Sequence, residues 1–308
     1  MGMTFSWIFS KPQNKKLLGF LVGFALLSCT GTEVHKTFSP HENPKESIML
    51  LTEKIDFISS KKLKPFYRYF EVHGLTIAGL NGVSDEFLVD VGKTYEAMFP
   101  KSGMDASMQS RVFDAAKNPE RGGKTLQRVG LSSHQDMHLD ELPGWDFTND
   151  HNQAVDFIWE MNEPGTNQVN EVLEHLLHTL TAIVFYQAFP EEWDYLSEES
   201  LLVRAMREAI QKGHYDISSY ESILDDSNED EEKYDVHKRI IAQEFAYWLI
   251  MAEWDNFPVI GLSSNEEWNI TNPQDVESKL SLGHELYTRY VQKIMAPPDP
   301  FLMRSLYH

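Results

Sequence analysis

The sequence has few of the residues that several common classes of protein require. One cysteine among 308 residues excludes an intrachain disulfide and a zinc site built from several cysteines. The chain has 27 basic residues against 47 acidic ones, a formal net charge of −20. A nucleic-acid-binding surface needs clustered lysine and arginine to meet the phosphates, so this balance argues against a nucleic-acid partner. The sequence contains no glycine-rich phosphate loop and no Gly-x-Ser-x-Gly elbow, so no motif supports a nucleotide-binding enzyme or a serine hydrolase.

What the sequence does contain is typical of a globular protein. Hydrophobic residues make up 42% of the chain and aromatic residues 12%, which is enough to build a large core. The length allows one large domain or two small ones. The pattern of elements predicts an α+β fold, with a small sheet in the N-terminal part and a mostly helical C-terminal half.

The N-terminal segment resembles a bacterial lipoprotein signal peptide. Three lysines precede an apolar run over residues 17–28, which is too short to cross a bilayer as a helix. The run ends at Cys29, the only cysteine of the chain, which stands where a signal peptidase would leave a lipid-modified residue. We therefore expect lipidation at Cys29 and a place in the bacterial cell envelope, in the outer membrane or on the periplasmic face. The membrane contact would be through the lipid anchor only. An ordinary secretory signal, which would release the protein, is the alternative.

Four segments are expected along the chain. Residues 1–28 form the signal peptide, and residues 29–65, which begin rich in Ser, Thr, Pro and charge, form a tether. Residues 66–165 form the α+β part, and residues 166–308 form a helical part that carries the candidate metal site. The connection over residues 132–166 is long, with one short helix expected over 154–161, and connections of this length in compact domains are often functional.

Periodicity predicts the main elements of both parts. Alternation of apolar and polar residues predicts one strand over residues 69–80, and a second strand is expected over residues 125–131. Ser84, followed by two acidic residues, is typical of a helix start. In the second half the helical period predicts four helices, over residues 167–189, 197–212, 236–255 and 272–295, the last opened by Asn272 and Pro273.

The helix predicted over residues 167–189 collects side chains that can bind a metal ion. At about 100° per residue, four of them fall within one stripe about 100° wide: Glu171, Glu174, His175 and His178. Aliphatic residues fill the opposite face, and no lysine or arginine occurs between residues 167 and 203. Buried carboxylates and imidazoles need partners, and a metal ion is one natural partner. Glu174 and His178 are one turn apart, so both can point at one ion.

A second helix offers a carboxylate far away in the sequence. Glu244 stands in an almost entirely apolar segment, so we expect it to face a cation or to become protonated. His237 lies seven residues earlier on the same face, and Tyr247 lies about one turn later. These side chains admit three interpretations, which are a metal site, a hydrogen-bonded polar seam between two buried helices, and an acid–base site without metal.

These two helices resemble the active-site elements of the zincin metallopeptidases, in particular the lethal-factor-like branch. That branch has a His-Glu-x-x-His helix, followed some tens of residues later by a glutamate on an aromatic-rich helix. The similar region covers roughly residues 165–295. The sequence departs from the motif, because it has Glu-His-x-x-His over residues 174–178.

The resemblance implies a role for each side chain of the cluster. Glu174, His178 and Glu244 would bind one divalent metal ion. His175 would stand in the place of the catalytic base, and His237 in the place of a tyrosine that stabilises the oxyanion. Glu171 and Tyr247 would surround these groups.

The resemblance also implies an activity, namely metal-dependent hydrolysis, with a peptide or protein as the substrate. Zinc is the expected ion, and a set with two carboxylates also suits iron or manganese. The alternative is a non-catalytic surface lipoprotein, a degenerate relative of the zincins that binds a partner or a ligand.

Overall fold

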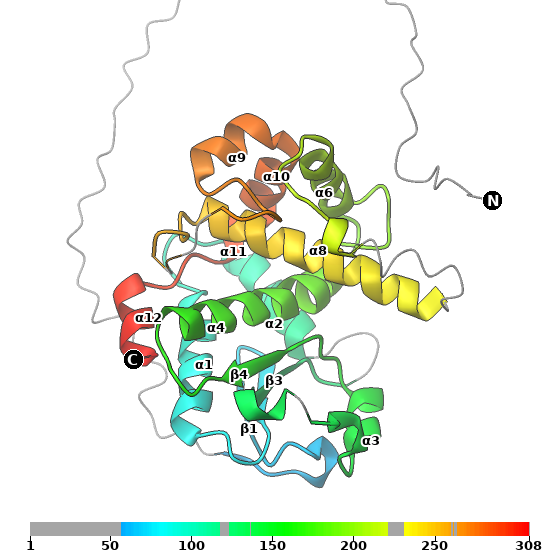
Figure 1. Ribbon diagram of the computed structural model, residues 1–308, viewed down its shortest axis with the longest axis vertical. Coiled ribbons are helices and arrows are strands. Elements are labelled where there is room, and N and C mark those ends of the chain that lie inside the picture. Colours follow the sequence, from blue (N-terminus) through cyan, green and yellow to red (C-terminus); the bar gives the residue numbers. More distant parts are fainter. Residues whose placement is uncertain are drawn as a thin grey trace, which may run out of the picture. The chain divides into compact units, whose positions relative to one another are not determined.

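The computed structural model describes residues 57–117, 123–135, 137–220, 231–259, 261 and 264–307. The expected signal peptide, Cys29 and most of the expected tether lie outside these ranges. All described residues belong to one compact unit, which covers residues 44–308. This unit combines one four-stranded sheet with a mostly helical second half, which confirms the predicted α+β class (Figure 1).

The sheet has the strand order β1-β2-β3-β4. The strands are β1 (Arg68–Val72), β2 (Leu75–Gly79), β3 (Leu126–Leu131) and β4 (Phe157–Glu160). β1 and β2 form an antiparallel hairpin, and β3 and β4 add to β2 as parallel strands. The hairpin turns at His73 and Gly74, both with positive φ, a conformation that glycine adopts at no steric cost. β3 lies where the second strand is predicted, but the single strand predicted over residues 69–80 is a hairpin, because the chain turns at His73 and Gly74.

β4 corrects one prediction, because it lies where a short helix is expected over residues 154–161. Its sequence is Phe157-Ile158-Trp159-Glu160, and aromatic and β-branched residues favour a pleated, half-buried surface. Pairing with β3 supplies the backbone hydrogen bonds that a helix would otherwise provide. The correction matters for function, since it places Asp156 at the start of an edge strand.

Two helices, α1 (Asp85–Ala97) and α2 (Ala106–Lys117), lie between β2 and β3 in the chain and pack on the sheet. α1 begins as predicted, with the Ser84 Oγ accepting a hydrogen bond from the backbone N–H of Phe87. The helix lies very close to β1, because a Cβ at Gly92 would stand 2.7 Å from the ring of Phe70. The buried side chains of α1 and the sheet form the N-terminal part of the core.

The helical half consists of short and long segments that surround two central helices. The central pair is α4 (Thr166–Thr179) and α8 (Glu231–Glu253), which contact each other and cross the middle of Figure 1. The others are α5 (Tyr186–Ala188), α6 (Leu201–Gln211), α9 (Pro273–Lys279), α10 (Ser281–Leu286), α11 (Gln292–Ile294) and α12 (Pro300–Leu306). α3 (Trp145–His151) belongs to the N-terminal part and contacts the short segments Lys61–Leu63 and Leu139–Glu141. Short 3₁₀ segments stand at Lys61–Leu63, Ser132–His134 and Leu139–Glu141, and π-helical turns at Leu180–Phe185 and Tyr287–Val291.

The helix predicted over residues 272–295 begins as expected but is not continuous. Asn272 caps α9, and Pro273 takes its first position. Leu280 leaves the helical conformation, with φ −123° and ψ 71°, and α10 starts directly after it. The carboxylate of Glu208 on α6 accepts hydrogen bonds from the backbone N–H of Leu282 and the hydroxyl of Ser281. This contact from a neighbouring helix satisfies the start of α10 and fixes the break.

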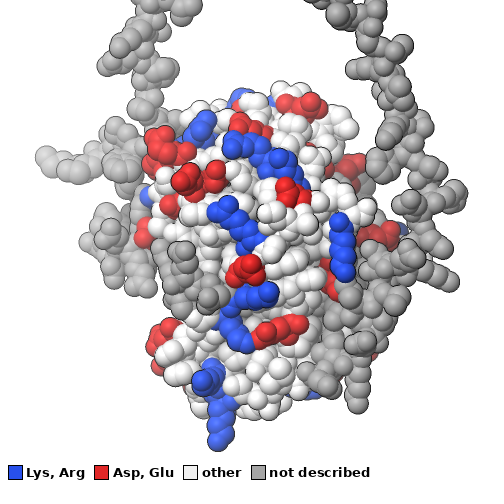
Figure 2. Space-filling view, turned by 180° about the vertical axis from the view of Figure 1, so that it is seen from behind, with Lys and Arg blue, Asp and Glu red and all other residues white. Residues whose placement is uncertain are grey.

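Residues 57–66, most of which fall within the predicted tether, contact the sheet. The backbone of Ile58 pairs with Tyr69 of β1, and the buried ring of Phe66 packs near the ring of Phe157. On the face of the described part that Figure 2 shows, acidic and basic side chains are interspersed. The acidic balance of the chain is therefore not concentrated in one patch on that face.

Candidate metal centre

The candidate site lies on α4, whose two faces differ as predicted. Val169, Val172, Leu173, Leu176 and Leu177 are buried in the core, and the acidic and imidazole groups occupy the other side. At its C-terminal end α4 passes into the π-helical turn Leu180–Phe185. Such turns occur frequently at functional sites, because the extra residue changes which side chains face a neighbouring element.

Two side chains of α4 tie this helix to the edge of the sheet. Gln168 accepts a hydrogen bond from the backbone N–H of Met161, and it donates one to the carbonyl of Trp159. Glu171 accepts a hydrogen bond of 2.9 Å from the backbone N–H of Trp159. These bonds satisfy backbone N–H and carbonyl groups on the free edge of β4 and the N–H of Met161, the residue after it. α4 is thereby held in a fixed position beside β4, with Glu171 half-buried between them.

The three predicted ligands converge. One oxygen each of Glu174 and Glu244 and one nitrogen of His178 lie within 4.8 Å of one another. The distance from the His178 Nε2 to the Glu244 Oε2 is 3.4 Å. One turn of α4 brings Glu174 and His178 together, and the packing of α8 against α4 brings Glu244. The three residues therefore have the geometry of a site that could hold one metal ion.

His178 is the most deeply buried of these residues. Its side chain is 1% exposed, and its Nε2 has no hydrogen-bond partner among the described residues. The Nδ1 on the opposite side of the ring is bonded to the carboxylate of Asp156 at 2.8 Å. A buried nitrogen without a partner is costly unless something else satisfies it. A cation between Glu174 and Glu244 would do so.

Electrostatics around His178 favour positive charge. Burial lowers the pKa of His178, but the nearby carboxylates of Asp156 and Glu244 outweigh burial and raise the pKa to about 9. Burial also raises the pKa of Glu174, and the neighbouring carboxylates Glu244 and Glu171 add to this shift. Without a metal ion, a proton on the imidazole balances part of the negative charge. A divalent cation can replace that proton, as happens when metal ions bind histidine.

A second group of ligand-capable atoms lies on the other side of the same ring. Asp156, His175 and His178 each offer one atom, and these three atoms also lie within 4.8 Å of one another. The His175 Nδ1 is 3.7 Å from Asp156, and its Nε2 is 3.3 Å from Glu171. Burial lowers the pKa of His175, but its two carboxylate partners raise it overall, to about 10. Without a metal ion, the neighbouring carboxylates therefore favour the protonated imidazole of His175.

Asp156 is the important residue that the sequence analysis did not find. Burial raises the pKa of this carboxyl, but the hydrogen bond from His178 and the nearby imidazoles of His178 and His175 hold the pKa well below its usual range. The Nε2 of Gln243 also donates to Asp156, at 2.9 Å. The one available signal was its position in the long connection over residues 132–166, which the sequence marks as a region of functional interest.

Tyr247, expected to surround the ligands, reaches Glu174 through one intermediate residue. Its hydroxyl donates a hydrogen bond of 2.6 Å to the Oδ1 of Asn170, and the amide of Asn170 donates one of 3.1 Å to Glu174. The ring of Tyr247 also stands edge-on to the ring of His178, with centroids 5.9 Å apart. α8 therefore positions Glu174 as well as supplying Glu244. Asn170 gave no signal in the sequence.

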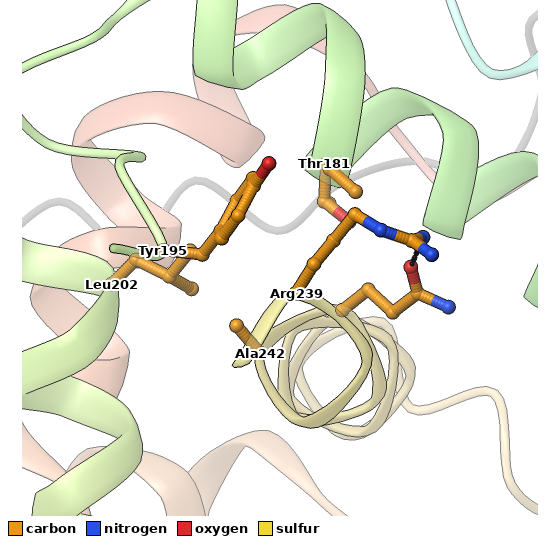
Figure 3. A pocket seen from close by; sticks show the side chains of 7 residues that line it. Thr181, Tyr195, Leu202, Arg239 and Ala242 are labelled. Atoms are coloured by element: carbon orange, nitrogen blue, oxygen red, sulfur yellow. Dashed lines mark hydrogen bonds between the residues drawn. The ribbon is translucent and has the colours of Figure 1, made fainter. Parts of the chain in front are cut away.

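The structure does not bring His237 into either group. This residue is half-buried on α8, seven residues and therefore about two helical turns before Glu244. A small hollow lies between the π-helical turn Leu180–Phe185, α6 and α8. Its lining residues are Thr181, Ala182, Tyr195, Leu202, Arg239, Ala242 and Gln243 (Figure 3). Gln243 contributes both to this hollow and to the hydrogen bonds of Asp156, so the hollow adjoins the candidate site.

A comparison of the chain with family models, with curated proteins and with solved structures finds no match. Among the described residues, no helix is both long and apolar enough to cross a membrane. The site is therefore characterised by its own geometry.

Proposed function

We propose that Glu174, His178 and Glu244 bind one divalent metal ion and that the protein is a metal-dependent hydrolase. The single observation that carries the proposal is the unpartnered Nε2 of the buried His178, which faces two carboxylates from different helices. Two carboxylates neutralise the charge of the ion, and the imidazole supplies the nitrogen ligand that zinc and its neighbours favour. Zinc is the simplest occupant, and iron or manganese also suits this set.

Three protein ligands leave a coordination position open, which is typical of catalytic rather than structural zinc sites. A divalent ion at such a position lowers the pKa of a bound water to near neutrality and polarises a substrate carbonyl. On the protein side, the Glu171–His175 pair stands next to the ligands and can move a proton, with Glu171 accepting and His175 donating. Tyr247 orients Glu174 through Asn170.

The resemblance to the lethal-factor-like zincins supports a peptide bond as the substrate. The order of elements is consistent with it, because the ligand helix α4 is followed by α6, the glutamate helix α8 and further C-terminal helices. We further propose that a lipid on Cys29 anchors the protein to the cell envelope.

Metal analysis of protein purified without chelator tests the proposal. We expect about one zinc, iron or manganese ion per chain, with the content falling toward zero in Glu174→Gln and Glu244→Gln. Glu163→Gln is the matched control, because Glu163 is an exposed glutamate just before α4. Equal metal content in all four proteins would remove the metal site, and a loaded protein that cleaves no peptide substrate would remove the hydrolase.

One observation favours a second candidate, a non-catalytic lipoprotein in which the same groups form a polar seam. The pKa values of His175 and His178 are raised to about 10 and about 9, so two imidazolium ions can balance the carboxylates at neutral pH. The seam would then join α4 to α8 without a metal ion. In that case Glu174→Gln would lower the stability of the fold and leave no metal content to lose.

A further inference from the structure

The two nitrogens of His178 have different neighbours, and these neighbours decide where its hydrogen lies. The Nδ1 is 2.8 Å from the Asp156 Oδ2 and 3.3 Å from the Gln243 Nε2. An amide nitrogen is a donor, so it cannot accept a hydrogen bond from the imidazole. The Asp156 carboxylate is therefore the acceptor, and the Nδ1 carries the hydrogen.

The orientation of Gln243 follows from its other partner. The Nη1 of Arg239 is 2.7 Å from the Oε1 of Gln243, in the hollow that Figure 3 shows. A guanidinium only donates, so the amide oxygen of Gln243 must face Arg239 and the amide NH₂ must face Asp156. Arg239 therefore donates to Gln243, and Gln243 donates to Asp156. The carboxylate of Asp156 also accepts a hydrogen bond from His178.

Two arginines hold the charge of Asp156. Arg128 and Arg239 both interact electrostatically with this carboxylate, and burial lowers the pKa of each guanidinium. Arg128 also donates a hydrogen bond to the carbonyl of Val155, the residue before Asp156, at 2.7 Å, and packs over the ring of Phe157. The backbone on both sides of Asp156 is thereby fixed, and its carboxylate is kept in the acceptor state.

We propose that Asp156 is a positioning residue that holds His178 in the tautomer with a free Nε2 lone pair, aimed at the ion between Glu174 and Glu244. The inference rests on the proposed metal site and deepens it. A nitrogen that donates to Asp156 cannot also bind an ion, so the two ligand-capable groups have different roles. Glu174, His178 and Glu244 hold the ion, and Asp156 orients the imidazole of His178. Carboxylates that accept a hydrogen bond from a metal-binding histidine commonly have this role.

Zinc affinity of the full chain tests the inference. We expect Asp156→Ala to weaken Zn²⁺ binding by about 10- to 100-fold, the usual effect of removing such a partner. Asp156→Asn keeps an acceptor oxygen and the size of the side chain but loses the charge, so its loss should be smaller. Asp150→Ala, which removes an exposed aspartate of the same connection, is the matched control and should bind Zn²⁺ as the wild type does.

Two further measurements separate positioning from a general loss of structure. Gln243→Ala should weaken Zn²⁺ binding in the wild type and have little effect in the Asp156→Ala background, because it acts through Asp156. In ¹⁵N-labelled protein loaded with Zn²⁺, the His178 Nδ1 should carry a slowly exchanging hydrogen that Asp156→Ala exposes to rapid exchange. Thermal melting of each variant identifies a loss of affinity that comes only from unfolding.

The outcomes are distinguishable from failure of the proposed function. Unchanged Zn²⁺ affinity in Asp156→Ala and Asp156→Asn, with the wild type binding normally, would overturn the positioning role and leave the metal site intact. A Zn²⁺ ion found on the Nδ1 of His178, and not on its Nε2, would also overturn the positioning role and leave the metal site intact. A wild-type protein that does not bind Zn²⁺ would overturn both proposals.

Discussion

The Nε2 of His178 and the Oε2 of Glu244 lie 3.4 Å apart, although one belongs to α4 and the other to α8. That distance is close enough for a shared ion, and the Nε2 makes no hydrogen bond among the described residues. The pair therefore distinguishes the two candidate functions. In a polar seam a proton would bridge the two groups, and in a metal site a cation would.

Metal removal should lower the melting temperature of the protein. A ligand that binds only the folded state stabilises it by about 2.7 kcal/mol when its free concentration is 100 times its Kd. For a protein of this size this corresponds to a rise of about 5 °C in the melting temperature. Calorimetry of protein treated with EDTA, then with excess Zn²⁺, measures the shift. Glu163→Gln should show the full shift and Glu244→Gln should lose it; an identical shift in both would contradict the site.

Tyr247→Phe should destabilise the fold and weaken Zn²⁺ binding. The change removes the hydroxyl that donates to Asn170 and leaves the partly buried Oδ1 of Asn170 without its donor, a loss of about 1 kcal/mol in the free energy of unfolding. Tyr95→Phe is the matched control, because the hydroxyl of Tyr95 is buried with no hydrogen-bond partner among the described residues. Urea unfolding of both variants measures the difference. Equal effects of the two substitutions would show that the bond to Asn170 contributes nothing.

The sequence predicts those side chains of the site whose positions follow from the helical repeat. An α-helix places residues four apart on one side, so Glu174 and His178 follow from the pattern, and a carboxylate in an apolar helix indicates Glu244. That α4 and α8 lie against each other is implied by the resemblance and not by either helix alone. The fold class follows similarly, since β1, β2, β3 and most helices have clear periods.

What the sequence leaves out depends on contacts between distant residues. Gln243 and Asp156 are 87 positions apart, and neither stands in a pattern that marks a partner. β4 has four residues, too few for a period to separate strand from helix, so its place at the sheet edge comes from pairing with β3. The break at Leu280 is likewise set by Glu208, a residue of another helix.

Gly130→Ala should destabilise the sheet next to the site. A Cβ at Gly130 would stand 2.6 Å from the ring of Trp159 on the neighbouring strand, so the ring would have to move. Overpacking of this kind costs about 1–3 kcal/mol in the free energy of unfolding. Because the backbone of Trp159 bonds to Glu171 of α4, the shift should also disturb the site. The double variant Gly130→Ala/Trp159→Leu makes room and should recover part of the stability in urea unfolding; no recovery would contradict the steric explanation.

Glu208→Gln should destabilise the fold at neutral pH and much less in acid. Partial burial raises the pKa of Glu208, but hydrogen bonds from Lys212, Leu282 and Ser281 outweigh it, so the pKa in the folded state lies below that of an ordinary glutamate. A carboxyl with a lowered pKa contributes stability that is fully present above its unfolded pKa and is lost as the pH falls through its folded pKa. The difference in the free energy of unfolding between wild type and variant, about 1 kcal/mol at pH 7, should therefore shrink below about pH 4.5. Glu285→Gln, which breaks the exposed pair with Arg289, is the control and should cost little at either pH. A difference for Glu208→Gln that stays constant from pH 7 to pH 4 would mean that the charge of Glu208 does not hold α10 to α6.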